Sequence, residues 1–277
     1  MARTWFITGA SSGFGSEIAR QALERGDNVV AGARRLDSLS ELRDRYAERV
    51  LLSRADVTDA ADRERALREA IERFGRIDVL VNNAGHTQVG AVEETTDEEL
   101  RDLFELHFFA PAALTRAVLP VMREQGGGWI VQMSSVGGQV TAPGFSAYCA
   151  TKFALEGLSE TLRDEVAPFG INVLIVEPGA FRTGLFRRGA ARFSEPMSAY
   201  DATVGATREY VATAGGSQPG DPAKAARAIL TAIESREPPL RLALGEDAIG
   251  NIRRRLASLN AELDRWAPVG SDTAVSA

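Results

Sequence analysis

Short apolar runs recur along the chain and alternate with stretches of helical periodicity. Residues 16–26 and 59–75 each keep apolar side chains on one helical face and end at a glycine. The alternation of strand and helix predicts parallel strands joined by right-handed crossovers, which is an α/β, doubly wound (Rossmann), seven-stranded parallel sheet with helices on both faces. The strands are expected at TWFIT (4–8), NVVAGA (28–33), RVLLS (49–53), IDVLVN (77–82), WIVQMS (129–134), INVLIV (171–176) and LRLAL (240–244).

The length of 277 residues suits one α/β domain, expected over residues 1–267. Residues 180–220 interrupt the alternation and carry five aromatic side chains: Phe181, Phe186, Phe193, Tyr200 and Tyr210. An insertion of this length in a compact domain is typical of a substrate-binding lid, and a mobile surface loop is the alternative. Residues 268–277 are small and polar, and a disordered tail is expected there.

Composition narrows the class of partner. A net charge of -6 and a pI near 5.2 give no electrostatic footprint for a polyanion, which argues against nucleic acid. The single cysteine, Cys149, fits a reducing compartment. The chain enters its first strand without a signal-peptide pattern, and no apolar segment approaches the length of a membrane span. A cytoplasmic protein without membrane contact is therefore expected.

A glycine-rich turn follows the first strand. The stretch TGASSGFG (8–15) opens the first helix, so Gly9 allows a tight turn while Gly13 and Gly15 let the backbone approach a phosphate. In a doubly wound fold this turn is the dinucleotide site, and Ser11, Ser12 and Phe14 belong to the same cradle. The alternative is that the glycines serve only the turn.

The end of the second strand bears on the choice of dinucleotide. Proteins that hold the ribose 2′-hydroxyl of NAD commonly place a carboxylate here, whereas this chain has Ala33 followed by Arg34 and Arg35. Guanidinium groups match a 2′-phosphate in charge and geometry, so NADP is favoured over NAD. A solvated basic turn is the alternative.

Tyr148 and Lys152 lie four residues apart in SAYCATKFALEG (146–157), a predicted helix, and so on one stripe of it. A nearby cation favours the phenolate, and such a tyrosine can donate a proton and take it back. Alternatively, the tyrosine ring packs on the fold and the lysine stem covers it. The pair alone leaves both interpretations open.

Five motifs together, in order and spacing, resemble the short-chain dehydrogenase/reductase family from about residue 3 to residue 183. They are TGASSGFG, NNAG (82–85), Ser135 thirteen residues before Tyr148, Lys152, and PGAFRT (178–183). The spacing TGxxxGxG resembles the smaller branch rather than the extended branch of epimerases and dehydratases. YCATKFALEG and LTRAVLP are most similar to hydroxysteroid and retinol dehydrogenase relatives. The resemblance also implies a homodimer or homotetramer formed through the helices that hold residues 97–124 and 146–168.

The resemblance implies a role for each motif residue. Tyr148 is the general acid and base, Lys152 lowers its pKa and holds the nicotinamide ribose, and Ser135 binds the substrate oxygen, with Ser134 structural. No metal site is implied. Further cofactor contacts are implied at Asp56 and Val57 (adenine), at Asn82, Ala84 and Gly85 (adenosine), and at Pro178, Gly179 and Thr183 (nicotinamide and pyrophosphate).

His107 departs from the family pattern, because many members carry asparagine at this position as a fourth catalytic residue. Histidine can still hydrogen-bond, and the relay of the family uses a backbone carbonyl here, so His107 is a catalytic candidate and a packed core residue is the alternative. His86, just after NNAG, is a candidate to face the substrate, and a loop histidine that faces water is the alternative. The arginines of FRRGAARF (186–193) and NIRRRL (251–256) are interpreted as a solvated face rather than an anion site.

The function expected from the sequence is an NADP-dependent oxidoreductase that interconverts an alcohol and a ketone or aldehyde by hydride transfer. The aromatic residues of the 180–220 segment favour an apolar substrate. A catalytically silent dinucleotide-binding sensor or partner protein is one alternative. A lyase or epimerase that retains its cofactor is another.

Overall fold

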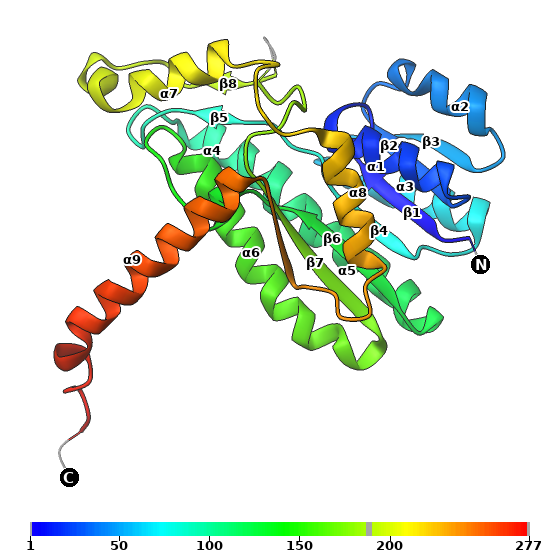
Figure 1. Cartoon of the computed structure of the whole chain (residues 1–277). Coiled ribbons are helices and arrows are strands. Elements are labelled where there is room, and N and C mark those ends of the chain that lie inside the picture. Colours follow the sequence, from blue (N-terminus) through cyan, green and yellow to red (C-terminus); the bar gives the residue numbers. More distant parts are fainter. Residues whose placement is uncertain (1, 187–189, 276–277) are drawn as a thin grey trace.

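The computed structural model describes residues 2–186 and 190–275. Its main sheet has seven parallel strands in the order β3-β2-β1-β4-β6-β7-β9, so the predicted doubly wound fold is confirmed (Figure 1). Each strand lies within two residues of an apolar run singled out in the sequence. The strands are β1 (Thr4–Thr8), β2 (Asn28–Ala33), β3 (Val50–Arg54), β4 (Val79–Asn82), β6 (Gly128–Met133), β7 (Ile171–Pro178) and β9 (Arg241–Leu244).

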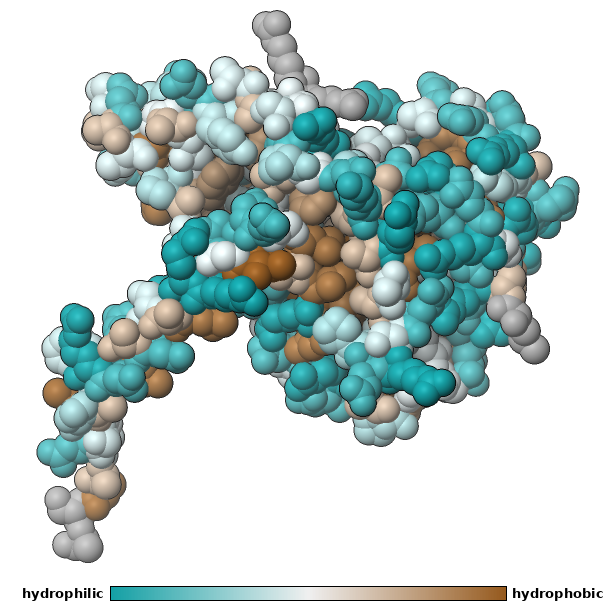
Figure 2. Space-filling model, in the orientation of Figure 1, coloured by the Kyte–Doolittle hydropathy of each residue, from teal (hydrophilic) through white to brown (hydrophobic). Residues whose placement is uncertain are grey.

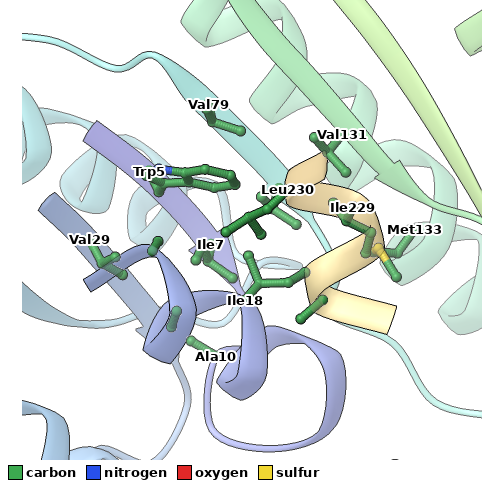
Figure 3. Packing of buried hydrophobic residues seen from close by; sticks show 14 of the residues in the cluster. Trp5, Ile7, Ala10, Ile18, Val29, Val79, Val131, Met133, Ile229 and Leu230 are labelled. Atoms are coloured by element: carbon green, nitrogen blue, oxygen red, sulfur yellow. The ribbon is translucent and has the colours of Figure 1, made fainter. Parts of the chain in front are cut away.

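Helices cover both faces of the sheet because successive strand residues point to opposite sides. Trp5 and Ile7 pack under α1 (Gly13–Glu24) and α8 (Pro222–Ile233), as Figure 3 shows. Phe6, between them, faces the opposite cluster with α3 (Ala60–Phe74), α5 (Ala110–Gln125) and α6 (Ser146–Val166). The remaining helical elements are η1 (Asp37–Leu39), α2 (Ser40–Tyr46), α4 (Asp97–Phe104), η2 (Glu105–Phe109), η3 (Val136–Gly138), η4 (Ala167–Phe169), η5 (Ser198–Tyr200), α7 (Asp201–Thr213) and α9 (Glu246–Gly270).

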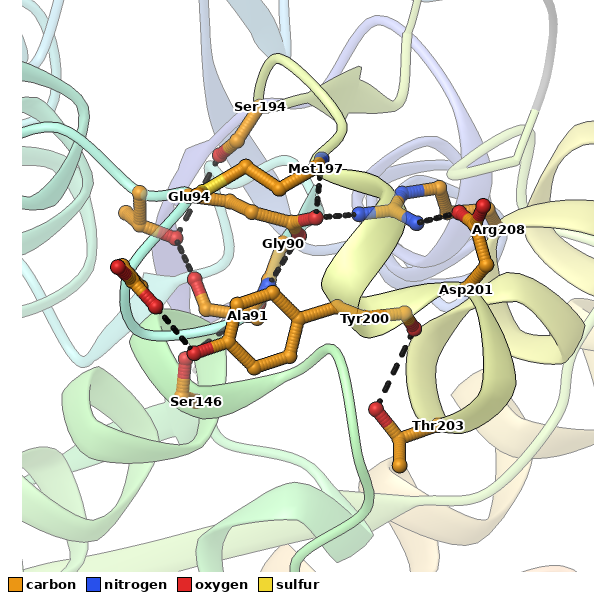
Figure 4. Close-up of polar contacts among 12 residues, drawn as sticks. Gly90, Ala91, Glu94, Ser146, Ser194, Met197, Tyr200, Asp201, Thr203 and Arg208 are labelled. Carbon is orange, nitrogen blue, oxygen red and sulfur yellow. Dashed lines mark hydrogen bonds and ion pairs between the residues drawn. The ribbon is translucent and has the colours of Figure 1, made fainter.

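The segment 180–220 is held against the body by contacts that the sequence did not predict. β8 (Arg192–Phe193) pairs in parallel with β5 (Gln88–Val89) as a separate two-stranded sheet. The Glu94 carboxylate is fully buried, accepts hydrogen bonds from the backbone amides of Ala91 (2.7 Å) and Met197 (2.8 Å), and forms an ion pair with Arg208 (Figure 4). A buried charge needs such a set of partners. These contacts join the segment to the loop after β5.

A buried acidic cluster lies between α6 and the last strands of the sheet. The Arg241 guanidinium Nε lies 3.0 Å from a carboxylate oxygen of Glu156 and 3.4 Å from one of Glu177. Both carboxylates are buried, at 5% and 2% exposure. Burial raises the pKa of Glu156 to about 7 and also raises the pKa of Glu177. The protonated form of Glu156 is therefore populated near neutral pH.

α9 leaves the body after its first two turns and projects away from it (Figure 1). Every residue from Arg253 to Gly270 is exposed, including the arginines of NIRRRL, as expected for a solvated face. The helix continues to Gly270, three residues into the segment for which a disordered tail is expected. None of the helices in residues 2–186 and 190–275 is long and apolar enough to span a membrane.

The buried Glu156 predicts a pH-dependent stability. Because its pKa is raised in the folded chain, its contribution to stability is complete below its usual pKa and is lost as the pH rises through about 7. Between pH 5 and pH 8 we expect the free energy of unfolding to fall by about 1–2 kcal/mol more in the wild type than in Glu156→Gln. Urea unfolding measures this difference. Glu160→Gln, at an exposed partner of the same arginine, is the control, and equal pH slopes for wild type and Glu156→Gln would contradict the assignment.

Candidate active site

Hydrogen bonds lock the carboxyl ends of β1 and β4 together. The Thr8 hydroxyl donates to the carbonyl of Val81 (3.2 Å) and accepts from the backbone amides of Asn83 (2.9 Å) and Ala84 (3.1 Å). The Asn83 side-chain amide donates to the carbonyls of Thr8 (2.9 Å) and Gly9 (3.2 Å). Asn83, which the sequence analysis did not single out, thus fixes the first residues of the glycine turn.

Backbone and side-chain atoms approach the turn so closely that its positions require glycine. Gly9 has φ +65°, and a Cβ on Gly15 would lie 2.5 Å from the carbonyl oxygen of Gly9. A Cβ on Gly13 would lie 2.9 Å from Cβ of Thr183, so the loop after β7 reaches the turn. Ser11 is half-buried and Ser12 is exposed at the N-terminus of α1, where backbone amides favour an anion. The turn and the PGAFRT loop therefore form one cradle.

Two aromatic rings close the side of this cradle. Phe14 packs edge-on against Phe181, with 5.2 Å between ring centroids. Pro178 is buried at the end of β7. Gly179 is held close to α9, since a Cβ there would lie 2.3 Å from an Asp247 carboxylate oxygen.

The candidate adenosine residues lie at the ends of β2, β3 and β4. Arg34 and Arg35 are exposed directly after β2, which is tied to the glycine turn by a hydrogen bond from the amide of Ala10 to the carbonyl of Gly32 (3.0 Å). The Asp56 carboxylate accepts from the backbone amide of Thr58 (3.0 Å), and Val57 is buried.

Asn82 and Asn83 point in different directions, as neighbouring residues at a strand end do. The Asn82 side-chain amide is buried and donates to Gln132 (3.0 Å) and Thr115 (3.2 Å), so it ties β4 to β6 and α5. Gly85 lies against His107, since a Cβ there would be 2.9 Å from the ring Nε2. The NNAG loop thus contacts both the glycine turn and the helix that carries His107.

Ser135, Tyr148 and Lys152 come together at the carboxyl end of β6. The Ser135 and Tyr148 side chains are half-buried and both lie against Gly137, since a Cβ there would be 3.1 Å from Cε1 of Tyr148 and 3.4 Å from Oγ of Ser135. The Lys152 Nζ donates to the carbonyl of Met133 (2.9 Å) and lies 5.7 Å from the Tyr148 ring centroid. Ser134 is buried on the other side, against Glu156 and beneath Gly138. The arrangement fits Ser135 rather than Ser134 as the serine that faces a substrate.

Burial is the main cause of the shifted pKa values of Tyr148 and Lys152. It raises the pKa of Tyr148 to about 12, although the hydrogen bond with Ser135 acts in the opposite direction. It lowers the pKa of Lys152 to about 8. The sequence led us to expect that Lys152 would lower the pKa of Tyr148, but among the protein's own groups desolvation is the larger effect. The phenol is therefore protonated at neutral pH and can act as a proton donor.

His107 lies in η2, a π-helical turn between α4 and α5, and π-turns are frequent at functional sites. Its Nε2 accepts from the backbone amide of His86 (3.3 Å), and its Nδ1 lies 3.0 Å from the hydroxyl of Thr151. Because that hydroxyl donates to the carbonyl of Tyr148 (2.8 Å), it must accept from Nδ1–H. The hydrogen bonds therefore assign a neutral ring, and burial lowers the pKa of His107 well below its usual value.

The imidazole of His107 meets the Tyr148 ring edge to face, at 5.6 Å between centroids. Thr151, which connects the two residues by hydrogen bonds, was missed in the sequence analysis because its partner is 44 residues away. The pKa of the half-buried His86 is lowered by burial to about 4, so this side chain is also neutral. Its ring lies 5.9 Å from that of His107.

The aromatic residues of the 180–220 segment pack largely on each other and on the body. Phe186 meets Tyr210 edge to face at 5.8 Å, and Phe145 lies 6.1 Å from Tyr148. Phe145 and Phe186 belong to one apolar cluster with Val89. Of the arginines in FRRGAARF, Arg192 is exposed, whereas Arg187 and Arg188 lie outside the described residues.

Known proteins are similar to this chain in sequence and in fold. The family model for short chain dehydrogenases matches residues 3–192. Oxidoreductase BOA17 of Botryotinia fuckeliana is 39% identical over 96% of this chain and 97% of its own length. A short-chain dehydrogenase crystal structure from Streptomyces avermitilis has a TM-score of 0.94 and 56% identity, covering 99% of this chain and 100% of that chain.

The structure of a Burkholderia cenocepacia short chain dehydrogenase in complex with NADP has a TM-score of 0.74 and 26% identity, covering 95% of this chain and 97% of that chain. The match to the family model and the full-length identity extend across the glycine turn, the NNAG loop and the Ser135, Tyr148 and Lys152 group. The chain therefore belongs to the short-chain dehydrogenase/reductase family, oxidoreductases that act on CH–OH groups with NAD or NADP.

Proposed function

We propose that the protein is an NADP-dependent oxidoreductase that interconverts an alcohol and a ketone or aldehyde, with Tyr148 as general acid and base. The observation that carries the proposal is the meeting of a protonated, half-buried phenol with Ser135 and Lys152 beside the glycine cradle. A catalytically silent dinucleotide-binding protein would not need these three side chains together. A lyase or epimerase is disfavoured by the TGxxxGxG spacing.

The residues present fit a dinucleotide. Gly9, Gly13 and Gly15 leave a cradle that a single Cβ would obstruct, and the N-terminus of α1 offers amides to a pyrophosphate. Arg34 and Arg35 would bind a 2′-phosphate on the adenosine ribose, with Asp56, Val57 and Ala84 beside the adenine end. Pro178, Gly179 and Thr183 would lie along the nicotinamide end, where the bound cofactor supplies or accepts hydride.

The chain's own residues would handle the substrate oxygen and its proton. Ser135 would hold the carbonyl oxygen next to the phenol, and Tyr148 would donate its proton as hydride reaches the carbonyl carbon. In alcohol oxidation the phenolate would take the proton back. Lys152, whose pKa is lowered to about 8, would stabilise that phenolate and bind the nicotinamide ribose.

We propose an apolar substrate and a lid over it formed by residues 180–220. Phe145, next to Tyr148, and Phe186 of the lid are both half-buried members of the apolar cluster, so each keeps apolar surface for a ligand. The Glu94 ion pair with Arg208 would hold the lid in place.

We also propose that the enzyme is a homo-oligomer and that it works in a reducing, cytoplasmic compartment. A homodimer or homotetramer through the helices at 97–124 and 146–168 is supported by Phe109 and Phe153, which are large, exposed and located there. A reducing, cytoplasmic setting fits the free buried thiol of Cys149.

The preference for NADP depends on Arg34. We expect Arg34→Ala to weaken NADPH binding about 10- to 100-fold and to leave NADH binding nearly unchanged, because a charge-assisted contact to phosphate contributes about 1.5–3 kcal/mol. Titration with each nucleotide, followed by nicotinamide fluorescence, measures both affinities. Arg43→Ala, an exposed arginine on α2, is the matched control. Tighter binding of NADH by the wild type would refute the NADP assignment.

The proton donor is tested by Tyr148→Phe, which keeps the ring and removes the hydroxyl. We expect turnover of ketones with NADPH to fall by about 10²–10⁴-fold while NADPH affinity stays within a few fold. Tyr46→Phe, on α2 outside the site, should leave turnover unchanged. Activity of Tyr148→Phe close to wild type would overturn the role of the phenol. Tight NADPH binding without turnover by the wild type, across a panel of apolar ketones, would favour the silent protein.

His107 we assign as a positioning residue that acts through Thr151 and the NNAG loop. Loss of both ring hydrogen bonds in His107→Leu should lower kcat roughly 10- to 100-fold. His107→Asn retains one donor and one acceptor and should recover most of that loss. Because the ring is neutral, the pH profiles of wild type and His107→Asn should have the same shape between pH 5 and pH 8. An ionisation present only in the wild-type profile would instead assign the proton transfer to His107.

A further inference from the structure

An apolar stripe runs along the part of α9 that lies outside the body. Leu256, Leu259, Leu263 and Trp266 are 50%, 40%, 68% and 60% exposed. Figure 2 shows brown side chains along this projecting helix among hydrophilic ones. Large apolar side chains in such a row lower the free energy when they are removed from water, so the stripe has the character of an interface.

The stripe follows a heptad repeat. Its apolar residues are spaced alternately by three and four positions over three heptads: Ile249, Ile252, Leu256, Leu259, Leu263 and Trp266. That spacing is the a and d pattern of a coiled coil, whose seam needs a second helix. The opposite side of the helix carries small or polar residues such as Arg254, Ser258 and Ala261. The pattern points to one partner helix along one face.

α9 has no such partner within the part of the chain that the structure describes. Every residue from Arg253 to Gly270 is exposed. Most helical stability in proteins comes from the packing of an apolar face rather than from helix propensity, and the exposed part of α9 lacks such packing within the described residues. Ile252 is partly covered by the body, whereas Leu256, Leu259, Leu263 and Trp266 are exposed. Such a row is expected to be covered by another chain.

We propose that α9 pairs with α9 of a second copy of this protein as a two-fold antiparallel coiled coil. In one register, Ile249 meets the partner's Trp266, Ile252 meets the partner's Leu263, and Leu256 meets the partner's Leu259. The two-fold axis generates the same three contacts a second time, with the two helices exchanged. All the a and d residues of both helices are then buried against each other, and a two-fold contact of this kind closes on itself without forming a filament.

Charge selects the antiparallel orientation. The first half of the exposed helix carries Arg253, Arg254 and Arg255, while its second half is net negative, with Glu262 and Asp264 against a single cation, Arg265. Antiparallel pairing brings Arg255 beside the partner's Glu262, once on each side of the axis. Parallel pairing would place arginine beside arginine and Trp266 opposite the partner's Trp266. Flanking charges of this kind set partner choice and orientation in coiled coils.

This contact differs from the family-type assembly through residues 97–124 and 146–168, because it is formed by the side chains of α9 alone. The α9 pair would therefore join assemblies of that kind, or pair single chains if that assembly is absent. In either case it adds an interface that does not use the catalytic residues.

Cysteine pairs test the register. Ile252→Cys and Leu263→Cys chains, co-expressed with different tags, should form a disulfide with each other under mild oxidation. Neither should cross-link to itself, since equivalent positions would be roughly 16 Å apart along the helix axis. The matched control is Arg254→Cys with Ala261→Cys, which has the same register on the outward face and should not cross-link. The native Cys149 is buried on α6 and does not interfere.

The outcomes separate the alternatives. Disulfides within each variant would mean parallel helices and would overturn the proposal. A second measurement, sedimentation equilibrium, should show that Leu263→Asp halves the mass of the assembly whereas Ala261→Asp does not change it. Arg255→Glu and Glu262→Arg should each weaken the association about 3- to 10-fold, and the double variant should restore it. If cross-linking is absent and Leu263→Asp leaves the mass unchanged, the proposal is wrong. In that case, binding to lipid vesicles that depends on Leu263 would assign the stripe to a membrane surface.

Discussion

The hydrogen bonds that Thr8 and Asn83 make between the ends of β1 and β4 are the constraint on which the rest of the site depends. They fix the glycine turn and, through the same loop, the backbone of His86. That backbone amide bonds to His107, the His107 ring bonds to Thr151, and the Thr151 hydroxyl bonds to the Tyr148 carbonyl. A continuous chain of hydrogen bonds thus joins the glycine turn to the candidate proton donor.

Burial, more than any single neighbouring charge, determines which groups are ionised. Desolvation keeps His107 neutral, keeps the Tyr148 phenol protonated and lowers the pKa of Lys152 to about 8. A neutral His107 can serve as acceptor on one ring nitrogen and donor on the other, which suits positioning rather than proton transfer. The same effect makes Glu156, one helical turn after Lys152, a carboxyl group that titrates near neutrality.

The sequence predicted the sheet well because each buried parallel strand is a run of apolar residues, and the glycine turn well because its glycines follow such a run directly. It could not reveal Asn83 and Thr151 as parts of the site, since both act through partners brought near by the fold. The sequence pointed to Asn82, but the Asn82 side chain turns toward α5 and the Asn83 side chain turns toward the glycine turn. Which face of the sheet each asparagine occupies depends on the register of β4, and the motif NNAG does not reveal it. β5 and β8 are two residues each, too short to show a period. The apolar spacing in residues 249–266 is visible in the sequence, but its exposure is not.

The first turn of α9 is hydrogen-bonded to the start of the 180–220 segment. The Asp247 carboxylate accepts a hydrogen bond from the backbone amide of Ala180 (2.8 Å), where the 180–220 segment begins. Only glycine at position 179 leaves room for that carboxylate. Since an acidic side chain is also favourable at a helix N-terminus, Asp247 stabilises both elements. The start of the 180–220 segment and the base of the projecting helix are therefore fixed by one side chain, beside the loop that carries Thr183 to the glycine turn.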